Sequence, residues 1–219
     1  MTLDKSLIIS ICTVAFLLAC TMFTPRATRG PAGVPGQGKL LFRDDFSNPA
    51  SGWTTQQSEG ITLEYTDGGF RIFVDNQLLP NEYPAAFIER TFGDVRVEAD
   101  VRRVTGSDSA KAALICRRAD PNHYVLGDID ANGIARLGTF ADDLFDILGY
   151  EEGTTGLQEG SNHLRLDCIG NTASLYVNGN LVVSAELDGP SQGSVGFAAG
   201  RSGEGQTDFH FNNFAVYAP

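Results

Sequence analysis

The chain has 219 residues and a formal net charge of −11 at pH 7. An acidic surface repels the phosphate backbone of nucleic acids and anionic lipid headgroups, so neutral glycans, cations and proteins remain as partner classes. Only 20% of the residues are charged, and the 25 glycines and 14 phenylalanines accompany many short, turn-bounded apolar runs. This composition is typical of an all-β globular protein and excludes a disordered acidic tail.

Residues 1–19 have the features of an export signal. Lys5 precedes an apolar run, Leu7 to Ala19, that is shorter than the roughly 20 residues of a membrane-spanning helix. The run ends in Leu17-Leu18-Ala19-Cys20, which resembles the lipobox of bacterial lipoproteins. That resemblance implies export, removal of the signal peptide and acylation of the Cys20 thiol, which would anchor the protein to the bilayer at the bacterial cell envelope. The alternative is an uncleaved anchor or an ordinary signal with a chance cysteine.

Residues 20–38 are predicted to form a tether between the lipidated Cys20 and a folded domain. This stretch contains Pro25, Pro31, Pro35 and four glycines, and it has no apolar periodicity. A β pattern begins at Lys39 and continues without a linker, which predicts one domain over residues 39–219. A domain of that size buries roughly 70% of its unfolded surface and can fold without a metal or a disulfide.

Short segments with period-two alternation predict the strands of this domain. Asp67-Gly68 and Asn132-Gly133 predict hairpin turns between neighbouring segments. The segment 112–117 is apolar on both faces, which predicts a central strand. Apart from the segment 164–187, the predicted strands are 40–46, 61–65, 70–74, 85–90, 95–104, 112–117, 123–130, 134–139, 144–150, 194–199 and 209–217.

The segment Leu164 to Leu187 predicts three strands joined by turns at Gly170-Asn171 and Asn178-Gly179. Its alternate residues form one apolar and one polar face, and the apolar face must be buried against a second layer. We therefore predict an all-β fold, a two-sheet antiparallel β-sandwich. In the last strand, a bulge at Asn212-Asn213 would bring four apolar side chains onto one face.

Four motifs together resemble a concanavalin A-like lectin/glucanase jelly roll, and in particular the bacterial laminin-G-like and 3-keto-disaccharide hydrolase-like domains. The resemblance covers Leu40 to Tyr217 and is specific for the fold. It implies little about function, since this fold carries lectins, hydrolases and adhesion modules alike. The motifs are Asp44–Asn48-Pro49 followed by Gly52-Trp53, Phe92–Arg102, Leu164–Gly179 with Leu175-Tyr176-Val177-Asn178-Gly179, and Phe211–Tyr217.

Glu98 and Asp100 are the weak catalytic candidates. Retaining glucanases of this fold carry Glu-x-Asp-x-x-Glu on a concave strand, and the third position here is Arg102 or Arg103. Without a third carboxylate, this motif cannot protonate a leaving oxygen. We favour the alternative, a charged strand face whose members pair with neighbours, and therefore a protein that is not an enzyme.

Asp128, Asp130 and Asn132 match the first half of a calcium-binding loop. The bidentate glutamate is missing, because position twelve is Thr139. We favour a plain Asn-Gly hairpin, and we expect no cofactor apart from a structural calcium ion that the fold would allow.

Cys116 and Cys168 are the only cysteines of the predicted domain. Both lie within predicted strands, and an exported protein meets an oxidising compartment. A disulfide between strands is therefore favoured over two reduced core cysteines.

Five aromatic residues are candidates for stacking on a sugar, and Tyr124 and Tyr150 come first because they lie at strand ends. The others are Tyr83, Phe145 and Trp53, and we expect Trp53 to lie in the core. The sequence favours a lipid-anchored surface module that contacts a carbohydrate or an envelope protein. A glycoside or 3-keto-disaccharide hydrolase is the first alternative, and a ligand-free structural or sensory ectodomain is the second.

Overall fold

A computed structural model of the chain describes residues 38–75, 83–142, 144–201, 203 and 205–219. The predicted signal peptide, the site of lipidation at Cys20 and nearly all of the predicted tether lie outside these residues. Among the described residues, none belongs to a helix with the length and hydrophobicity that a membrane span requires.

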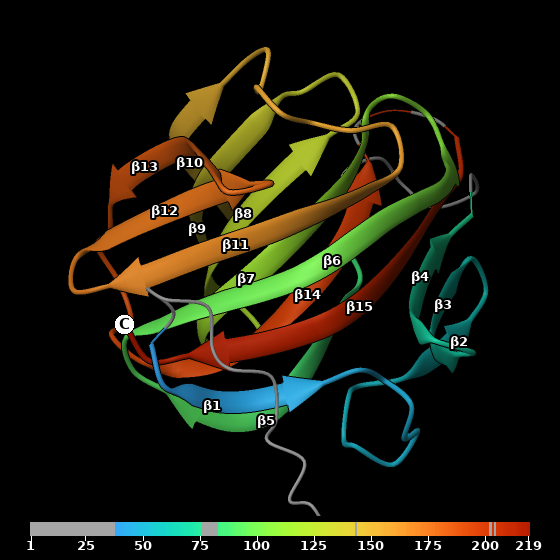
Figure 1. Cartoon of the computed structure of the whole chain (residues 1–219), viewed down its shortest axis with the longest axis horizontal. Coiled ribbons are helices and arrows are strands. Elements are labelled where there is room, and N and C mark those ends of the chain that lie inside the picture. Colours follow the sequence, from blue (N-terminus) through green and yellow to red (C-terminus); the bar gives the residue numbers. More distant parts are fainter. Residues whose placement is uncertain (1–37, 76–82, 143, 202, 204) are drawn as a thin grey trace, which may run out of the picture. The chain divides into compact units, whose positions relative to one another are not determined.

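The described residues form two antiparallel sheets (Figure 1). The nine-stranded sheet contains β1 (Leu40–Asp44), β2 (Gln56–Ser58), β3 (Ile61–Thr66), β4 (Gly69–Val74), β6 (Val95–Gly106), β11 (Ser161–Ile169), β12 (Thr172–Val177), β13 (Asn180–Glu186) and β15 (Thr207–Tyr217). The six-stranded sheet contains β5 (Ala85–Phe92), β7 (Ala110–Asp120), β8 (His123–Asp130), β9 (Ala135–Ala141), β10 (Leu144–Glu151) and β14 (Gly193–Arg201).

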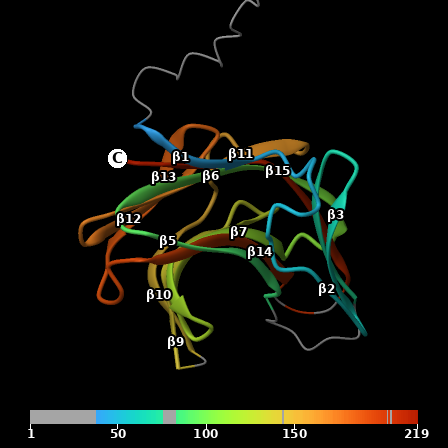
Figure 2. The same ribbon diagram turned by 90° about the horizontal axis from the view of Figure 1, so that it is seen from below.

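The two sheets stack as the layers of a sandwich, which confirms the predicted fold (Figure 2). The nine-stranded sheet has the order β13-β12-β11-β6-β15-β4-β3-β2, with β1 paired to β15. The six-stranded sheet has the order β10-β9-β8-β7-β14-β5, so β7 is central as predicted. The apolar faces of both sheets meet in one continuous core.

Aromatic rings from both sheets and from the loop after β1 fill one part of the core. Trp53 is 5% exposed, and its ring meets that of Phe214 edge-on at 4.7 Å between centroids. The indole N–H of Trp53 donates to Asp44 Oδ2 at 2.9 Å, so its polar atom is satisfied inside the core. The prediction that Trp53 lies in the core is confirmed.

The predicted bulge in the last strand is present. Asn213 has a φ of 51°, and the register between β15 and β6 shifts between Asn212 and Ala215. The extra residue restores the alternation on the inner face after the bulge. As a result, four large apolar side chains of the strand lie in the core: Phe209, Phe211, Phe214 and Val216.

The predicted disulfide joins Cys116 of β7 to Cys168 of β11 and therefore links the two sheets. The two Cα atoms are 6.7 Å apart, and the residues are separated by 52 positions in the sequence. Closing a loop of that length in the unfolded chain adds about 4 kcal/mol of stability in the chain-entropy model.

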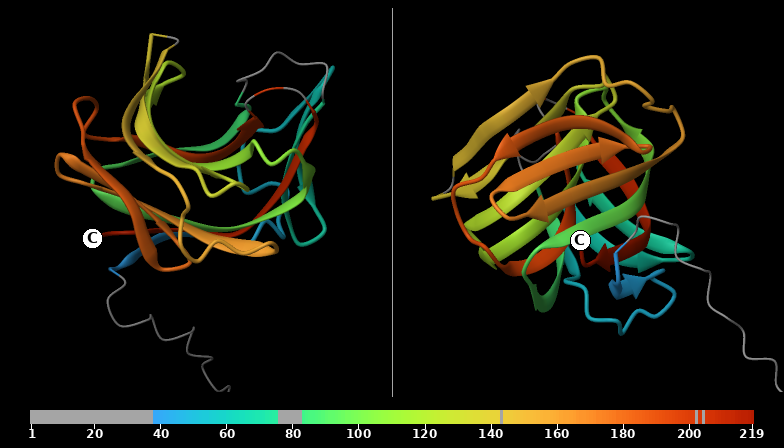
Figure 3. Two further views of the ribbon diagram at one scale, coloured as in Figure 1. Left: turned by 90° about the horizontal axis from the view of Figure 1, so that it is seen from above. Right: turned by 60° about the vertical axis from the view of Figure 1, so that its left-hand side comes forward.

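The outer face of the six-stranded sheet is concave. The sheet curves so that the β9–β10 hairpin rises at one side of this face (Figures 2 and 3). A second apolar cluster lies on it, formed by Ala113, Ile115, Leu126 and Ala198. This cluster explains why β7 is apolar on both faces, because one face meets the core and the other lines a hollow.

Candidate functional site

A cavity of about 200 Å³ lies on this outer face, and we call it the concave cavity. Its walls come from three neighbouring strands and from the residues just before β5. The lining residues are Tyr83, Tyr124, Leu126, Asp128, Arg136, Phe140 and Phe145.

The alternation of β8 and its register with β9 position most of these side chains. Tyr124, Leu126 and Asp128 alternate along β8 and therefore point to the same face. On β9, Phe140 is the cross-strand partner of Tyr124, and Arg136 is the partner of Asp128. The cavity therefore has an aromatic end and a charged end, with Leu126 between them.

The aromatic end is a row of rings across the sheet. The rings of Tyr124 and Phe140 are stacked, with centroids 4.9 Å apart and planes 10° from parallel. Phe145 of β10 is the cross-strand partner of Phe140, and its ring lies toward the charged end, with the Arg136 guanidinium carbon 5.5 Å from the ring centroid. A Cβ at Gly138 would clash with the backbone carbonyl oxygen of Asp146 and lie 3.0 Å from the Phe145 ring, so the close approach of β10 at this point requires glycine.

The charged end is a buried ion pair with a tyrosine. Asp128 is fully buried, and Arg136 donates from Nε at 3.0 Å to Oδ1 and from Nη2 to Oδ2. The same Nη2 donates to the hydroxyl of Tyr83 at 2.6 Å. Burial raises the pKa of Asp128, and the Arg136 guanidinium opposes this shift. Burial and the Asp128 carboxylate raise the pKa of Tyr83, so its hydroxyl stays protonated.

Lys111 of β7 adds a further cation near this end. It is 4% exposed and is the cross-strand partner of Asp130. Burial and the neighbouring Arg136 lower the pKa of Lys111, whereas Asp128 and Asp130 raise it. Arginine, lysine and aspartate therefore meet within one small region of the sheet.

This arrangement suits a ring with one apolar face and a polar edge. Aromatic side chains offer flat apolar surface to C–H groups, and a fixed set of charged and hydroxyl groups orients polar substituents. Asp128 and Arg136 hold each other in place, so their remaining hydrogen-bonding capacity is presented from a rigid position.

A larger cavity, of about 310 Å³, opens at one end of the sandwich between the sheets. Its floor is made of inward-facing core side chains. We take the concave cavity as the candidate site because it combines an aromatic wall with a buried ion pair.

Two of the three predicted calcium ligands, Asp128 and Asp130, have hydrogen-bond partners within the protein. Asp128 pairs with Arg136, while Asp130 Oδ1 accepts the backbone N–H groups of Asn132 at 2.9 Å and Ile134 at 3.0 Å. Within the described ranges, no group of three or more His, Cys, Asp or Glu side chains could hold a metal ion. Asp130 therefore stabilises the hairpin between β8 and β9, in which Gly133 has a φ of 79°.

Glu98 and Asp100 lie on the other sheet, on the face of β6 that points away from the core. His163 Nδ1 lies 2.8 Å from Asp100 Oδ1 and Nε2 lies 3.6 Å from Glu98 Oε2, while Asn213 Nδ2 donates to Asp100 at 2.8 Å. The hydrogen bonds to Asp100 and Glu98 raise the pKa of His163 to about 9. These contacts agree with a charged face whose members pair across strands, although Glu98 is 5% exposed and thus more buried than a solvated face implies.

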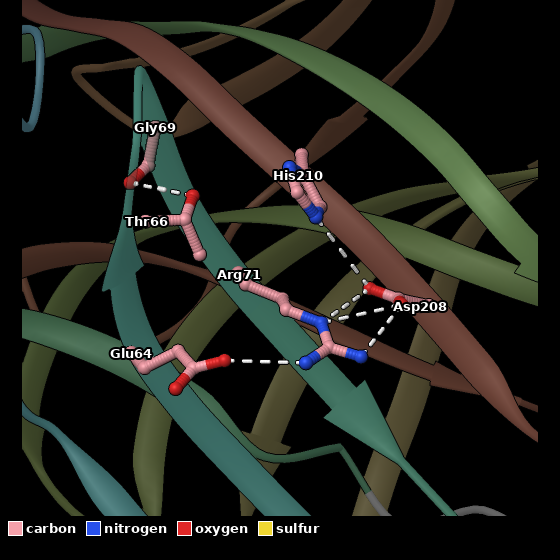
Figure 4. A network of polar contacts seen from close by, with 6 residues as sticks. All are labelled: Glu64, Thr66, Gly69, Arg71, Asp208 and His210. Carbon is pink, nitrogen blue, oxygen red and sulfur yellow. Dashed lines mark hydrogen bonds and ion pairs between the residues drawn. The ribbon is translucent and has the colours of Figure 1, made fainter.

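A second network on the nine-stranded sheet is built in the same way (Figure 4). Arg71 of β4 pairs with Asp208 of β15 at 2.9 Å and with Glu64 of β3 at 3.2 Å. Both networks therefore consist of ion pairs between neighbouring strands on the outer face of this sheet.

No protein-family model matches the chain, and no curated protein matches its sequence. Solved structures do match. The carbohydrate binding module CBM66 from Bacillus subtilis is 18% identical, with a TM-score of 0.62 over 76% of this chain and 96% of that one. The Bacillus licheniformis β-glucanase is 13% identical, with a TM-score of 0.60 over 83% and 99%. SCLam, an endo-β-1,3(4)-glucanase from family GH16, is 10% identical, with a TM-score of 0.60 over 85% and 93%.

The domain has the concanavalin A-like jelly-roll fold. This confirms the resemblance read from the motifs between Leu40 and Tyr217. At these identities the likeness establishes the fold only, and the function has to be inferred from the residues of the site.

Three of the five aromatic candidates line the concave cavity, and two do not. Tyr83, Tyr124 and Phe145 line the concave cavity of the jelly roll, whereas Trp53 lies in the core. Tyr150 is 49% exposed and is the cross-strand partner of Arg136, but it does not line the cavity. Its hydroxyl donates to Glu152 at 2.6 Å. A ligand-binding role for Tyr124 and Tyr150 stays a prediction.

Arg136 and Phe140 were not predicted as site residues. Both lie on β9 with the same alternation, and both are partners of residues that the sequence singled out, Asp128 and Tyr124. The signal was therefore present once the hairpin at Asn132-Gly133 is used to pair the two strands.

Proposed function

We propose that this protein is a carbohydrate-binding module and that the concave cavity holds a sugar ring. The observation that carries the proposal is the stacked pair Tyr124–Phe140 facing the Arg136–Asp128–Tyr83 group in one cavity. The printed names of the similar structures, a carbohydrate binding module and β-glucanases, support the same class of ligand.

The cavity favours a small neutral unit. Its volume of about 200 Å³ is below the roughly 300–1,000 Å³ of sites for drug-sized ligands, which suits a single ring better than a long chain segment. The Asp128 carboxylate and the Arg136 guanidinium neutralise each other, so the charged end offers hydrogen bonds without a large net field.

Binding without hydrolysis is the version that the site supports. Glycoside hydrolysis ordinarily needs two carboxyl groups that flank the scissile bond. Among the described residues that line the concave cavity, Asp128 is the only carboxylate, and it is held by Arg136. Glu98 and Asp100 are on the other sheet, and turnover that depends on Glu98 would argue for the hydrolase alternative.

The experiment is calorimetric titration of the protein with neutral oligosaccharides, beginning with mixed-linkage β-glucan fragments and extending to a glycan array. The expected result is binding that Tyr124→Ala weakens by about tenfold or more. Tyr176→Ala is the matched control, because Tyr176 lies on β12 of the other sheet, where Arg165 covers its ring at 4.2 Å. An equal loss of affinity in the two variants, or no binding to any glycan on the array, would count against the proposal.

We also propose that the module is tethered to the cell envelope through acylated Cys20. The lipobox-like sequence before Cys20 supports this, and two or more acyl chains give firm anchoring. Intact-mass analysis of the protein purified from a bacterial membrane fraction is expected to find a lipid-modified N-terminal cysteine and no residues 1–19. An unmodified chain that begins at Met1 would contradict the anchor.

A further inference from the structure

The larger cavity lies between the two sheets, where the β6–β7 hairpin, the β8–β9 turn and the segment 157–160 meet, and we call it the end cavity. Its volume is about 310 Å³, which is within the lower range of small-molecule sites. Its lining residues are Val101, Arg103, Asp108, Ala110, Ala112, Ile129, Asp130, Ala131, Asn132, Leu157, Gln158, Glu159, Gly160, Asn162 and Phe209.

The floor of the end cavity is apolar and belongs to both sheets. Val101 and Phe209 contribute from the nine-stranded sheet, and Ala112 and Ile129 contribute from the six-stranded sheet. Sheets in a sandwich are about 10 Å apart, and large inward side chains normally fill that space. β7 presents alanine at position 112, so the gap between the layers stays open at this end.

The wall formed by residues 157–160 is held in a fixed position. Asn162 Oδ1 accepts the N–H of Gln158 at 2.8 Å, and Asn162 Nδ2 donates to the carbonyl of Gln158 at 2.8 Å. Asn178 Nδ2 also donates to Asn162 Oδ1 at 2.8 Å. Hydrogen bonds therefore fix the segment that bounds the opening.

The rim of the end cavity is acidic. Asp108 and Glu159 carry two negative charges there, and Arg103 carries one positive charge, which leaves a net charge of −1. The charge of Asp130 is balanced by Lys111, its cross-strand partner. Arg103 Nη1 is already engaged, because it donates to the carbonyl of Ser107 at 2.9 Å and pairs with Asp108 at 3.3 Å. The whole chain is also acidic, with a net charge of −11. An anion would therefore be repelled at this opening, and a cation would be attracted.

We propose that the end cavity binds a small amphipathic cation, with its apolar body between the sheets and its ammonium group at the acidic rim. Apolar surface removed from water in the floor would supply affinity, and the rim carboxylates would select the sign of the charge. This site is separate from the concave cavity and does not depend on the proposed function.

The test uses three probes of similar size that share a phenyl ring and differ in charge: benzylamine, benzyl alcohol and benzoate, each titrated into the full chain. Methyl signals are followed by NMR, and affinities are measured by calorimetry. The expected order of affinity is benzylamine, then benzyl alcohol, then benzoate, with shifts at the methyl groups of Val101 and Ile129. Equal affinities for benzylamine and benzoate, or shifts confined to other residues, would overturn the proposal.

Two variants locate the site and its charge. Ala112→Leu fills the floor and is expected to abolish benzylamine binding while the protein stays folded; retained binding would contradict the site. Glu159→Gln is expected to weaken benzylamine by about threefold and to leave benzyl alcohol unchanged, as for an exposed charge pair. Asp188→Asn, on an exposed loop outside the cavity, is the matched control for loss of a carboxylate. If Ala112→Leu does not fold, the methyl shifts in the unmodified protein decide alone.

Discussion

Arg136 and Asp128 face each other across β9 and β8 and form two hydrogen bonds at the charged end of the concave cavity. The carboxylate is completely buried, so the pair is both a structural element and the polar part of the candidate site. Stability and binding are therefore expected to respond together when either residue is changed.

Removal of one partner of this pair is expected to destabilise the fold strongly. Arg136→Met leaves the buried Asp128 carboxylate without the guanidinium that donates two hydrogen bonds to it, and breaking a buried pair in this way costs about 3–5 kcal/mol. The double variant Arg136→Met with Asp128→Leu removes both charges and is expected to recover most of that loss. Urea denaturation of the single and double variants measures the difference, and a fully additive pair of losses would contradict a direct interaction.

The disulfide is expected to contribute to stability without affecting the concave cavity. Reduction of Cys116–Cys168 frees a loop with a sequence separation of 52 and is expected to lower the free energy of unfolding by about 4 kcal/mol. Denaturation midpoints of the oxidised and reduced protein provide the measurement. A midpoint that does not change on reduction would show that the link between the sheets is not needed once the core has formed.

His163 is expected to make stability depend on alkaline pH. Its pKa is raised in the folded protein to about 9, first by the hydrogen bond to Asp100 and then by Glu98. The stabilisation is therefore fully present below the unfolded pKa of about 6.5, and it is lost as the pH rises through about 9. The His163 side chain is 42% exposed, so solvent screening reduces the effect to about 1 kcal/mol.

The measurement for His163 is a series of urea denaturations between pH 6 and pH 10. In His163→Gln, the fall in stability between those values is expected to be smaller than in the unmodified protein. An identical pH dependence in both proteins would mean that other groups control the alkaline limit.

The bulge on β15 gives a further prediction about packing. Asn213 has a φ of 51°, a region in which a β-branched residue is strained. Asn213→Val is expected to lower the free energy of unfolding by about 1–3 kcal/mol, through strain and loss of the hydrogen bond to Asp100. Asn213→Gly loses the same hydrogen bond without the strain, so it is the control. If both variants lose equal stability, backbone strain at the bulge is negligible.

The strands were largely predictable because apolar and polar residues alternate along a strand that buries only one of its faces. The prediction for residues 123–130 coincides with β8, and Phe209 with Phe214 revealed the bulge through their change of parity. β2 (Gln56–Ser58) was missed, since its three residues are all exposed and polar and leave no apolar pattern.

The site was predictable only in part. Tyr124 was found because it begins a strand, but the pairing of Asp128 with Arg136 requires the β8–β9 register. The curvature that makes one face of the six-stranded sheet concave arises from all six strands together, so the sequence of a single strand does not predict it. Glu98 and Asp100 likewise match two positions of a catalytic motif in the sequence. In the structure they lie on the nine-stranded sheet, whereas the concave cavity is on the six-stranded sheet.

Sugar binding in the concave cavity can be located by NMR titration with a neutral oligosaccharide. We expect chemical-shift changes at Tyr124, Phe140 and Arg136, which line the cavity. We expect no changes at Glu98 and Asp100 on the opposite sheet. Changes around Glu98 and Asp100, with the signals of the cavity residues unmoved, would rule out the concave cavity as the sugar site.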